Sequence, residues 1–219
     1  MGNFGLCDKK VLEIGLYFLF LYFCRSINSN KMYKEILKWV IVIISQPTRA
    51  WEMLTKKEEK NDEFLSRFVY PLIGLVTVAA FLGVLFTRKE FDVELALKSS
   101  IRTLVSSFGG FYLGSYFLNE LWQNMFKRAK DMKLCQRFVG YSSSLMFALN
   151  IVLMLLPEFF FLRIFILYTV YIVWEGAGPY MQVEENQRLK FVGIATAIIL
   201  LTPMLIEFAL SLLMPGLRF

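Results

Sequence analysis

Long apolar runs without a single charge constrain this chain more than any other feature. Residues 68–86 (FVYPLIGLVTVAAFLGVLF) and 138–156 (FVGYSSSLMFALNIVLMLL) contain no Asp, Glu, Lys or Arg. A helix needs roughly 20 largely apolar residues to cross a hydrocarbon core about 30 Å thick. The chain also has only 19% charged residues, whereas soluble domains have about 25%. We therefore predict an integral membrane protein.

Three further stretches complete the predicted set of membrane spans. They are residues 103–118, residues 159–178 with Arg163 and Glu175, and residues 191–214 with Glu207. The first is slightly short, but the helix-compatible residues before it supply another turn. The sequence thus predicts an all-α fold, a polytopic membrane helical bundle with five transmembrane helices in one domain, residues 65–219.

Two segments precede this five-helix domain. Residues 32–64 are predicted to form short interfacial helices divided at Pro47, with Trp39 and Trp51 as anchors at the lipid headgroups. These helices either lie flat on the bilayer or pack as a cytoplasmic cap, and the two arrangements are compatible.

Residues 1–31 form an N-terminal extension with its own apolar segment. That segment, residues 11–24, is too short for a comfortable span and contains Glu13. An uncleaved signal-like segment, an interfacial helix and a wrongly assigned start all stay open. We favour the last, with Met32 as the true first residue.

Lys and Arg are distributed unevenly over the segments between the predicted spans. Segments 48–67, 119–137 and 179–190 carry twelve: Arg49, Lys56, Lys57, Lys60, Arg67, Lys127, Arg128, Lys130, Lys133, Arg137, Arg188 and Lys190. The other side carries five: Arg88, Lys89, Lys98, Arg163 and Arg218. Because cationic residues are retained on the cytoplasmic side, we expect a multi-pass protein of a cytoplasmic (inner) membrane. Its N-terminal side would be cytoplasmic and its C-terminus outside.

The composition gives little support to catalysis or to nucleic-acid binding. His is absent, and Cys7, Cys24 and Cys135 lack the spacing of metal ligands. We therefore expect no cofactor, no metal, no catalytic residues and no enzymatic activity. The net charge of +6 is interrupted by long apolar runs, so nucleic acid is not an expected partner. We also expect Cys135 to lie in a cytoplasmic loop, outside any disulfide and accessible to labelling.

Small residues recur at intervals of four in two of the predicted spans. They are Ser106, Gly110 and Gly114 in one, and Gly140, Ser144 and Ala148 in the other. Small side chains let helix backbones approach closely, which matters in lipid because hydrophobicity does not drive helices together there. We expect these helix-packing faces to meet each other or a partner. Packing within one subunit is favoured over a homodimer seam.

Three charged residues are predicted to share one level near the outer edge of the bilayer. At about 1.5 Å per residue, Glu207 lies about 24 Å along its span, and Arg102 and Arg163 enter from that same side. A carboxylate at this depth is costly unless it is paired. We expect Glu207 to pair with Arg163 or Arg102. Separate extension of each side chain to the interface is the alternative.

Glu175 lies near the cytoplasmic edge of the fourth span, directly before Gly176, Ala177, Gly178 and Pro179. Pro179 has no amide hydrogen for the carbonyl of Glu175, and its ring crowds that carbonyl, so the helix must open there. The two glycines tolerate the irregular backbone that results. The segment is either an ordinary helix end or a polar pocket lined by Glu175 and freed carbonyls.

Several of these stretches carry a family likeness. "IISQPTRAWEML" before the first span, the pair Gly109–Gly110, five hydrophobic spans and "YIVWEGAGPYMQVEENQRLKF" together resemble the Yip (Ypt/Rab-interacting protein) membrane family. The closest likeness is to its bacterial branch, especially Bacteroides-type members, over roughly Met32–Phe219. The resemblance implies a five-span protein with a cytoplasmic N-terminus and brings no catalytic residues. The Asp-Leu-Tyr-Gly-Pro motif of eukaryotic members is missing here, so the resemblance does not extend to a small-GTPase partner.

The sequence therefore favours a membrane-organising or scaffold role through helix packing and cytoplasmic loops. The expected partners are the lipid bilayer and either further copies of the chain or other membrane proteins. The alternative is a small transporter or channel subunit, with a polar route lined by Glu175, Glu207, Arg163 and Arg102.

Overall fold

The computed structural model describes residues 30–57, 59–87 and 93–213. The predictions for residues 1–29, including the segment 11–24 and the two cysteines Cys7 and Cys24, lie outside these ranges. By its internal contacts the chain divides into two units, Met1–Lys38 and Trp39–Phe219. The described part of the first unit is the beginning of helix α2 (Asn30–Ser45), and the second unit holds the rest.

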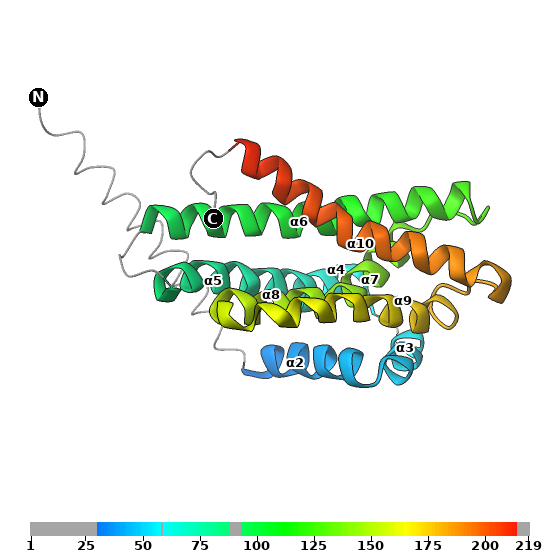
Figure 1. Ribbon diagram of the computed structural model, residues 1–219. Coiled ribbons are helices and arrows are strands. Elements are labelled where there is room, and N and C mark those ends of the chain that lie inside the picture. Colours follow the sequence, from blue (N-terminus) through cyan, green and yellow to red (C-terminus); the bar gives the residue numbers. More distant parts are fainter. Residues whose placement is uncertain (1–29, 58, 88–92, 214–219) are drawn as a thin grey trace, which may run out of the picture. The chain divides into compact units, whose positions relative to one another are not determined.

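Every regular element in the described part of the chain is a helix, which confirms the predicted all-α class (Figure 1). After α2 the order is α3 (Pro47–Lys56), α4 (Asn61–Phe64), a π-helical turn η1 (Leu65–Val69), α5 (Tyr70–Thr87), α6 (Val93–Asn124), α7 (Met132–Ser142), α8 (Ser144–Leu155), a 3₁₀ helix η2 (Pro157–Tyr168), α9 (Thr169–Ala177) and α10 (Glu185–Leu213).

Four helical stretches in the described residues are long and apolar enough to cross a membrane. They are Asn61–Phe86, Met132–Leu155, Pro157–Ala177 and Glu185–Leu213. Each contains most of one predicted span, so four of the five predicted spans coincide with candidate membrane-spanning helices. The first begins at Asn61, whereas the predicted boundary of the membrane domain lies at residue 65, because α4, η1 and α5 join without a break.

The remaining predicted span, residues 103–118, lies inside α6, whose average composition is more polar. Its 32 residues extend about 48 Å at about 1.5 Å per residue. The buried face of α6 is rich in small and polar residues, among them Ser106, Ser107, Gly110 and Ser115, whereas residues such as Leu113 and Phe117 are exposed. This is the inverse of a helix in a soluble protein, which turns its apolar side inward.

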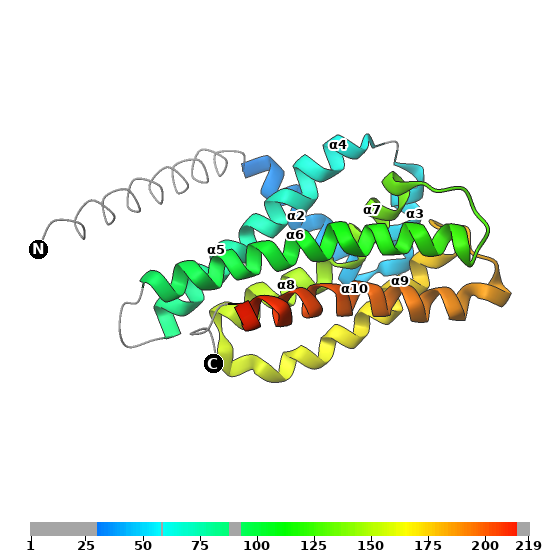
Figure 2. The same cartoon turned by 90° about the horizontal axis from the view of Figure 1, so that it is seen from above.

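Helix α6 is central to the packing of the second unit. It contacts α5 along one side and α10 along another, and α5 packs in turn against α8. Figures 1 and 2 show α5, α6 and α8 running along one another, and in Figure 1 α10 crosses α6 obliquely. Close approach is possible because a Cβ at Gly110 would lie 2.7 Å from Cβ of Pro203 in α10.

The predicted span 138–156 is interrupted at Ser143, between α7 and α8. Short hydroxyl side chains compete with the helix for backbone partners, and Ser144 Oγ donates to the carbonyl of Tyr141 at 2.7 Å. The following reversal at Leu156 leads into η2, where Pro157 is tolerated in the first turn. None of the η2 residues is buried.

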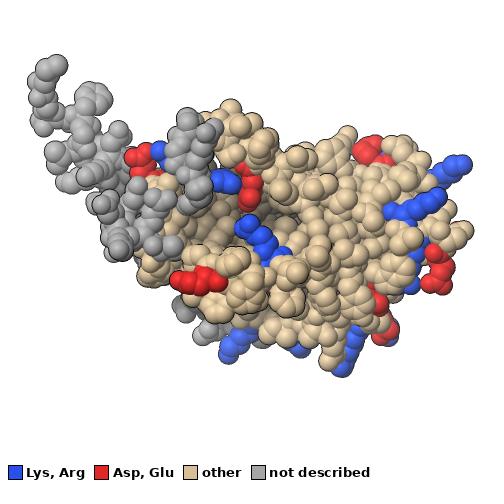
Figure 3. All heavy atoms as spheres, viewed as in Figure 1, with Lys and Arg blue, Asp and Glu red and all other residues tan. Residues whose placement is uncertain are grey.

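The three cation-rich segments meet at one end of the second unit, which we call the cationic end: the described residues of 48–67, 119–137 and 179–190. Asn61 Nδ2 donates to Gln136 Oε1 at 2.8 Å, and Arg128 donates to the carbonyl of Gln182 at 3.4 Å. On the face seen in Figure 3, charged side chains gather at the right, where α6 and α9 end and α10 begins. The opposite end is where α5, α8 and α10 finish and where α6 and η2 begin.

Candidate functional site

The cationic end is built around the contact between α3 and α9. Helix α3 starts with Pro47 at its first position, where the missing amide hydrogen costs no helical bond. Its buried residues Pro47, Ala50, Trp51 and Leu54 recur at spacings of three and four, which places them on one face. This face meets α9, and we call the contact the α3–α9 junction.

Glu175 belongs to this junction. Its Oε2 accepts a hydrogen bond at 2.9 Å from Oγ1 of Thr48, the second residue of α3. The half-buried carboxylate thus lies beside the N-terminus of α3, where the helix dipole stabilises negative charge. An acid at the edge of an apolar span therefore has a structural explanation: Glu175 binds a helix that is 127 residues away in sequence.

Trp51 is the most deeply buried large side chain of the junction. It is fully inaccessible, and its Nε1 donates to the carbonyl of Ile172 at 2.9 Å. The indole ring lies against the backbone of Gly176, where a Cβ would come within 2.5 Å of ring carbon Cε2. The predicted role of Trp51 as a headgroup anchor is wrong, because the ring fills the space between α3 and α9 instead of facing lipid.

The chain reverses after α9 through backbone hydrogen bonds to the last residues of the helix. α9 ends at Ala177, and the carbonyl of Gly176 accepts from the amides of Tyr180 at 3.1 Å and Met181 at 3.3 Å. Thr55 of α3 also lies 3.3 Å from the carbonyl of Pro179. The helix therefore ends directly before Pro179, as both predicted alternatives require. Gly178 has an unstrained φ of −73°, so the glycine that matters is Gly176, and it matters for close approach.

Arg188 ties the start of α10 to the end of α9. Its Nη2 and Nε donate to the carbonyl of Trp174 at 2.8 and 3.2 Å, and the guanidinium stacks 4.6 Å above the Trp174 ring. The last carbonyls of a helix have no partner in the helix itself. A cation there satisfies one of them and complements the negative end of the dipole.

A second polar group of the cationic end surrounds Glu59. Its Oε2 accepts from Tyr141 Oη at 2.9 Å and pairs with Lys57 Nζ at 3.0 Å, while its backbone carbonyl accepts from Arg137 at 3.2 Å. Lys57 Nζ also lies 4.8 Å from the centre of the Trp39 ring. The linker before α4 is thereby fixed to α7.

Aromatic rings fill the space beneath these polar contacts. Trp51 stacks on Phe138 with 5.2 Å between ring centres, and Tyr180 lies 5.1 Å from Trp51. Burial raises the pKa of Tyr180 to about 12, so its hydroxyl stays neutral. This packing also contradicts one prediction about α7: Cys135 is fully buried and does not lie in an accessible loop.

The charged candidates of the opposite end do not form the predicted pair. Glu207 Oε1 accepts from Ser106 Oγ at 3.2 Å, which links α10 to α6. Arg102 is half-buried and Arg163 is exposed. Of the ion pairs between described residues, none includes these three side chains, so the predicted pairing of Glu207 with Arg163 or Arg102 is replaced by a hydroxyl contact.

The small residues meet partners within the chain. Gly110 faces Pro203, and Gly114 lies between Ile198 and Val139, so the stripe on α6 packs chiefly against α10. In the second stripe, Gly140 and Ser144 are covered by the chain and Ala148 is not fully covered. Gly140 faces Phe64, whose Cζ would lie 2.6 Å from an added Cβ, and Ser144 is fully buried. Ala148 is only half-buried.

The sequence reasoning missed the α3–α9 junction as a unit. It singled out Glu175 and Pro179 on one strip of sequence, and Pro47 and Trp51 on another, without joining them. The amphipathic spacing of α3 was the available signal, because a buried stripe with Trp51 at its centre requires a facing surface. Nothing local identifies Gly176 as the residue that receives the ring.

A comparison with protein-family models identifies the family of this chain. The family model described as the Yip1 domain matches residues 41–206, which include both sides of the α3–α9 junction and all residues from α3 to the Pro203 turn of α10. No curated protein and no solved structure matches the chain. The matched region is more than half of the sequence. The chain therefore belongs to the Yip1 domain family of integral membrane proteins.

Proposed function

We propose that this protein is a five-span scaffold of a cytoplasmic membrane that presents the cationic end to other membrane proteins or to further copies of itself. The proposal is non-enzymatic, since it depends on helix packing and on a folded surface and not on a reacting group. The observation that carries it is the α3–α9 junction, where two sequence-distant segments are joined into one surface through Thr48–Glu175 and Trp51–Ile172.

The fifth span in this proposal is α6. Its exposed residues include Leu104, Val105, Leu113 and Phe117, which suit contact with hydrocarbon. Its small and polar residues face α5 and α10, as is common for helix interfaces in lipid. With α6 counted, successive spans alternate in direction and bring all three cation-rich segments to one side.

The orientation follows from the same end of the molecule. Lys and Arg of short connecting segments are retained in the cytoplasm, so the cationic end is proposed to be cytoplasmic. Helix α10 then finishes outside. An inner membrane is the membrane to which this rule applies most directly.

Support for a scaffold over a conduit comes from the use of the intramembrane charges. Glu175 binds Thr48, and Glu207 binds Ser106, so both carboxylates hold helices together. Glu175 lies at the cationic end. Glu207, in the second half of α10, and Arg102, in the first half of α6, both lie toward the opposite end. A transporter or channel subunit would instead use them as one polar route.

The test compares protein capture by three variants in native membranes. Crosslinking followed by identification of captured proteins is carried out for Gly176→Leu, for the matched control Gly193→Leu, and for a variant with Glu175→Gln, Glu207→Gln, Arg102→Gln and Arg163→Gln. Gly193 is exposed and has nothing within 4 Å of an added Cβ. A scaffold loses its captured partners only in Gly176→Leu, provided that the variant is still inserted.

The opposite pattern contradicts the scaffold. If the four-charge variant loses function while Gly176→Leu retains both partners and function, the chain is a conduit. Capture of copies of this chain alone narrows the role to self-assembly. Two-sided labelling of single cysteines introduced at Lys190 and Leu213 tests the topology, and accessibility of both from one side overturns the five-span arrangement.

A further inference from the structure

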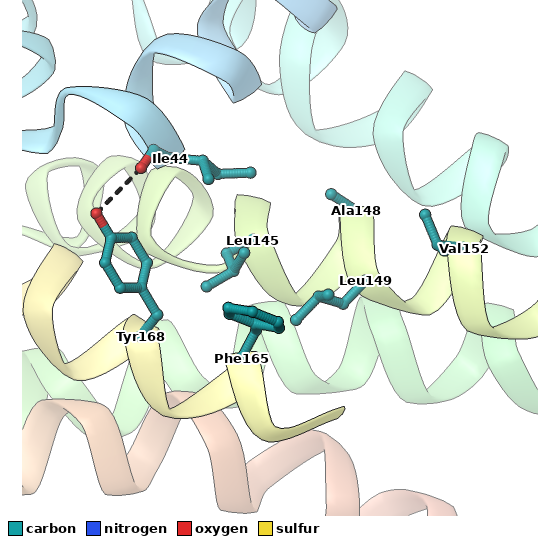
Figure 4. Close-up of a pocket in the computed structure, with 7 residues that line it drawn as sticks. All are labelled: Ile44, Leu145, Ala148, Leu149, Val152, Phe165 and Tyr168. Atoms are coloured by element: carbon teal, nitrogen blue, oxygen red, sulfur yellow. Dashed lines mark hydrogen bonds between the residues drawn. The ribbon is translucent and has the colours of Figure 1, made fainter. Parts of the chain in front are cut away.

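An apolar groove lies between α8 and η2, below the last turn of α2 (Figure 4). Its volume is about 380 Å³. Helix α8 supplies Leu145, Ala148, Leu149 and Val152, η2 supplies Phe165 and Tyr168, and α2 supplies Ile44. No residue of the α3–α9 junction takes part, so the groove is separate from the candidate site.

The chemistry of the groove selects an apolar occupant. The one polar side-chain atom in its lining is the hydroxyl of Tyr168, which already donates to the carbonyl of Ile44 at 3.1 Å. Figure 4 shows this hydrogen bond at one end and hydrocarbon side chains along the rest. A polar ligand would lose its hydration here without gaining hydrogen bonds.

Ala148 keeps the groove open. It sits between larger α8 residues that line the same face, Leu145, Leu149 and Val152, and Figure 4 shows the Phe165 ring facing Leu145 and Leu149. The other small residues of this helix face, Gly140 and Ser144, are covered by the chain itself. A larger side chain at position 148 would occupy the space directly.

The groove is continuous with the surface that faces the bilayer. Its walls belong to two of the candidate membrane spans, Met132–Leu155 and Pro157–Ala177. At the rim Phe165 is 54% exposed and Val152 is 37% exposed, and η2 has no buried residue at all. Bilayer hydrocarbon is therefore what reaches the opening.

We propose that this groove holds part of one acyl chain of a membrane phospholipid as an ordered lipid. From Leu145 to Val152 the wall is about 10 Å long at about 1.5 Å per residue, so it engages a portion of a chain. An empty groove would forfeit dispersion contacts that a flexible methylene chain supplies. The acyl chain also covers part of η2, a 3₁₀ segment kinked at Phe159, none of whose residues is buried by the protein itself.

The experiment uses the full chain in phosphatidylethanolamine and phosphatidylglycerol vesicles that contain a phospholipid with a photoactivatable diazirine in its acyl chain. Labelled peptides are identified by mass spectrometry. Ala148→Phe, which fills the groove, is expected to reduce labelling of α8 and η2 about fivefold through lost dispersion contacts. The matched control Leu201→Phe adds bulk at an exposed position of α10 and leaves that labelling unchanged.

A second variant covers the case in which Ala148→Phe does not fold. Phe165→Ala removes a wall of the groove and is expected to keep the label on α8 while losing it from η2. Equal labelling of every lipid-facing helix, unaffected by Ala148→Phe, overturns the proposal. So does a crosslink from a photoreactive residue at position 165 to another copy of the chain, because a protein helix would then occupy the groove.

Discussion

At the cationic end, side chains from opposite halves of the sequence bind one another, whereas at the opposite end the helices meet mainly through apolar and backbone surfaces. Thr48, Trp51 and Thr55 all donate to α9 or the turn after it, across more than 120 residues of sequence. At the other end α5 and α8 come so close at Gly83 that an added Cβ would overlap the carbonyl oxygen of Met154.

This difference follows the change of solvent along the helix axes. Polar side chains near the headgroups have water as a competitor, so each hydrogen bond there adds only about 0.5–1.5 kcal/mol, but its geometry selects which segments join. Within hydrocarbon, helices are held by close van der Waals packing of small residues. Long-range polar contacts are therefore concentrated at the cationic end, whereas direct backbone-to-backbone approach is found at the other.

Removal of the central ring should have the largest effect at the cationic end. Trp51→Ala is expected to destabilise the protein by about 3–5 kcal/mol, because it leaves a cavity where a fully buried indole packs. Thermal or denaturant unfolding of the detergent-solubilised chain measures this. Trp51→Phe keeps an aromatic ring but removes the hydrogen bond to Ile172. Its stability is expected to be only about 1–2 kcal/mol below that of the unchanged protein. A loss below 1 kcal/mol for Trp51→Ala would show that α3 is not anchored at this position.

The packing of the opposite end is tested at Gly83. Gly83→Ala is expected to cost about 1–3 kcal/mol, since the clash is with backbone and α5 must move away from α8. Gly193→Ala is the matched control, because its Cβ would enter open space, and it should be neutral or slightly stabilising. Equal stability of the two variants would remove the distinction between tight and loose helix contacts.

The selective hydrogen bonds of the junction are tested at Thr48. Thr48→Val keeps the shape of the side chain and removes the donor to Glu175, with an expected loss of about 0.5–1.5 kcal/mol. Thr48→Ser should restore most of it. A double-mutant cycle with Glu175→Met, which removes the acceptor, measures the coupling. Additive effects would mean that the carboxylate contributes nothing through Thr48.

Loss of the Glu207 carboxylate is expected to lower the stability of the protein less than loss of the Glu175 carboxylate. With Ser106 as its partner and no ion pair to any described residue, Glu207→Gln is expected to change stability by less than about 0.5 kcal/mol, since the amide oxygen can still accept from the hydroxyl. Arg102→Gln and Arg163→Gln serve as comparisons in the same unfolding assay. A large loss in Glu207→Gln, matched by the loss in either Arg variant, would restore the predicted ion pair.

The thiol of Cys135 is expected not to react with a maleimide while the protein is folded. Its side chain is fully buried beside Asn119, so a membrane-permeant maleimide is expected to leave it unmodified until the chain unfolds. Mass spectrometry of the peptide that contains residue 135 checks this. Rapid modification in native membranes would mean that α7 opens at the cationic end.

The sequence was sufficient for features that depend on solvent preference averaged over a whole helix. Four spans followed from runs of apolar residues, and the grouping of segments 48–67, 119–137 and 179–190 followed from alternation of spans. Contacts between individual side chains could not be predicted from the sequence. The partner of Glu175 lies 127 residues away in sequence. For Glu207 the sequence predicts an arginine as partner, but it does not distinguish an arginine from Ser106 on the facing helix.

Single aromatic residues were the least predictable. A tryptophan close to the membrane boundary is typical of a headgroup anchor, and the same residue serves equally well as the centre of a buried contact. What decides the role of Trp51 is Gly176, because only a residue without a Cβ leaves room for the ring. That information is divided between two distant positions and is absent from each alone.

The inward polarity of α6 has a consequence for how the protein is made. With Ser106, Gly110 and Ser115 on one side, this helix partitions poorly into lipid by itself, and the surface that covers much of that side belongs to α10. Ribosomes synthesise α10 after α6. In the proposed five-span arrangement, the nascent chain therefore has a half-protected segment at the translocon, and a chaperone or delayed lateral release would have to shelter it until α10 has been made.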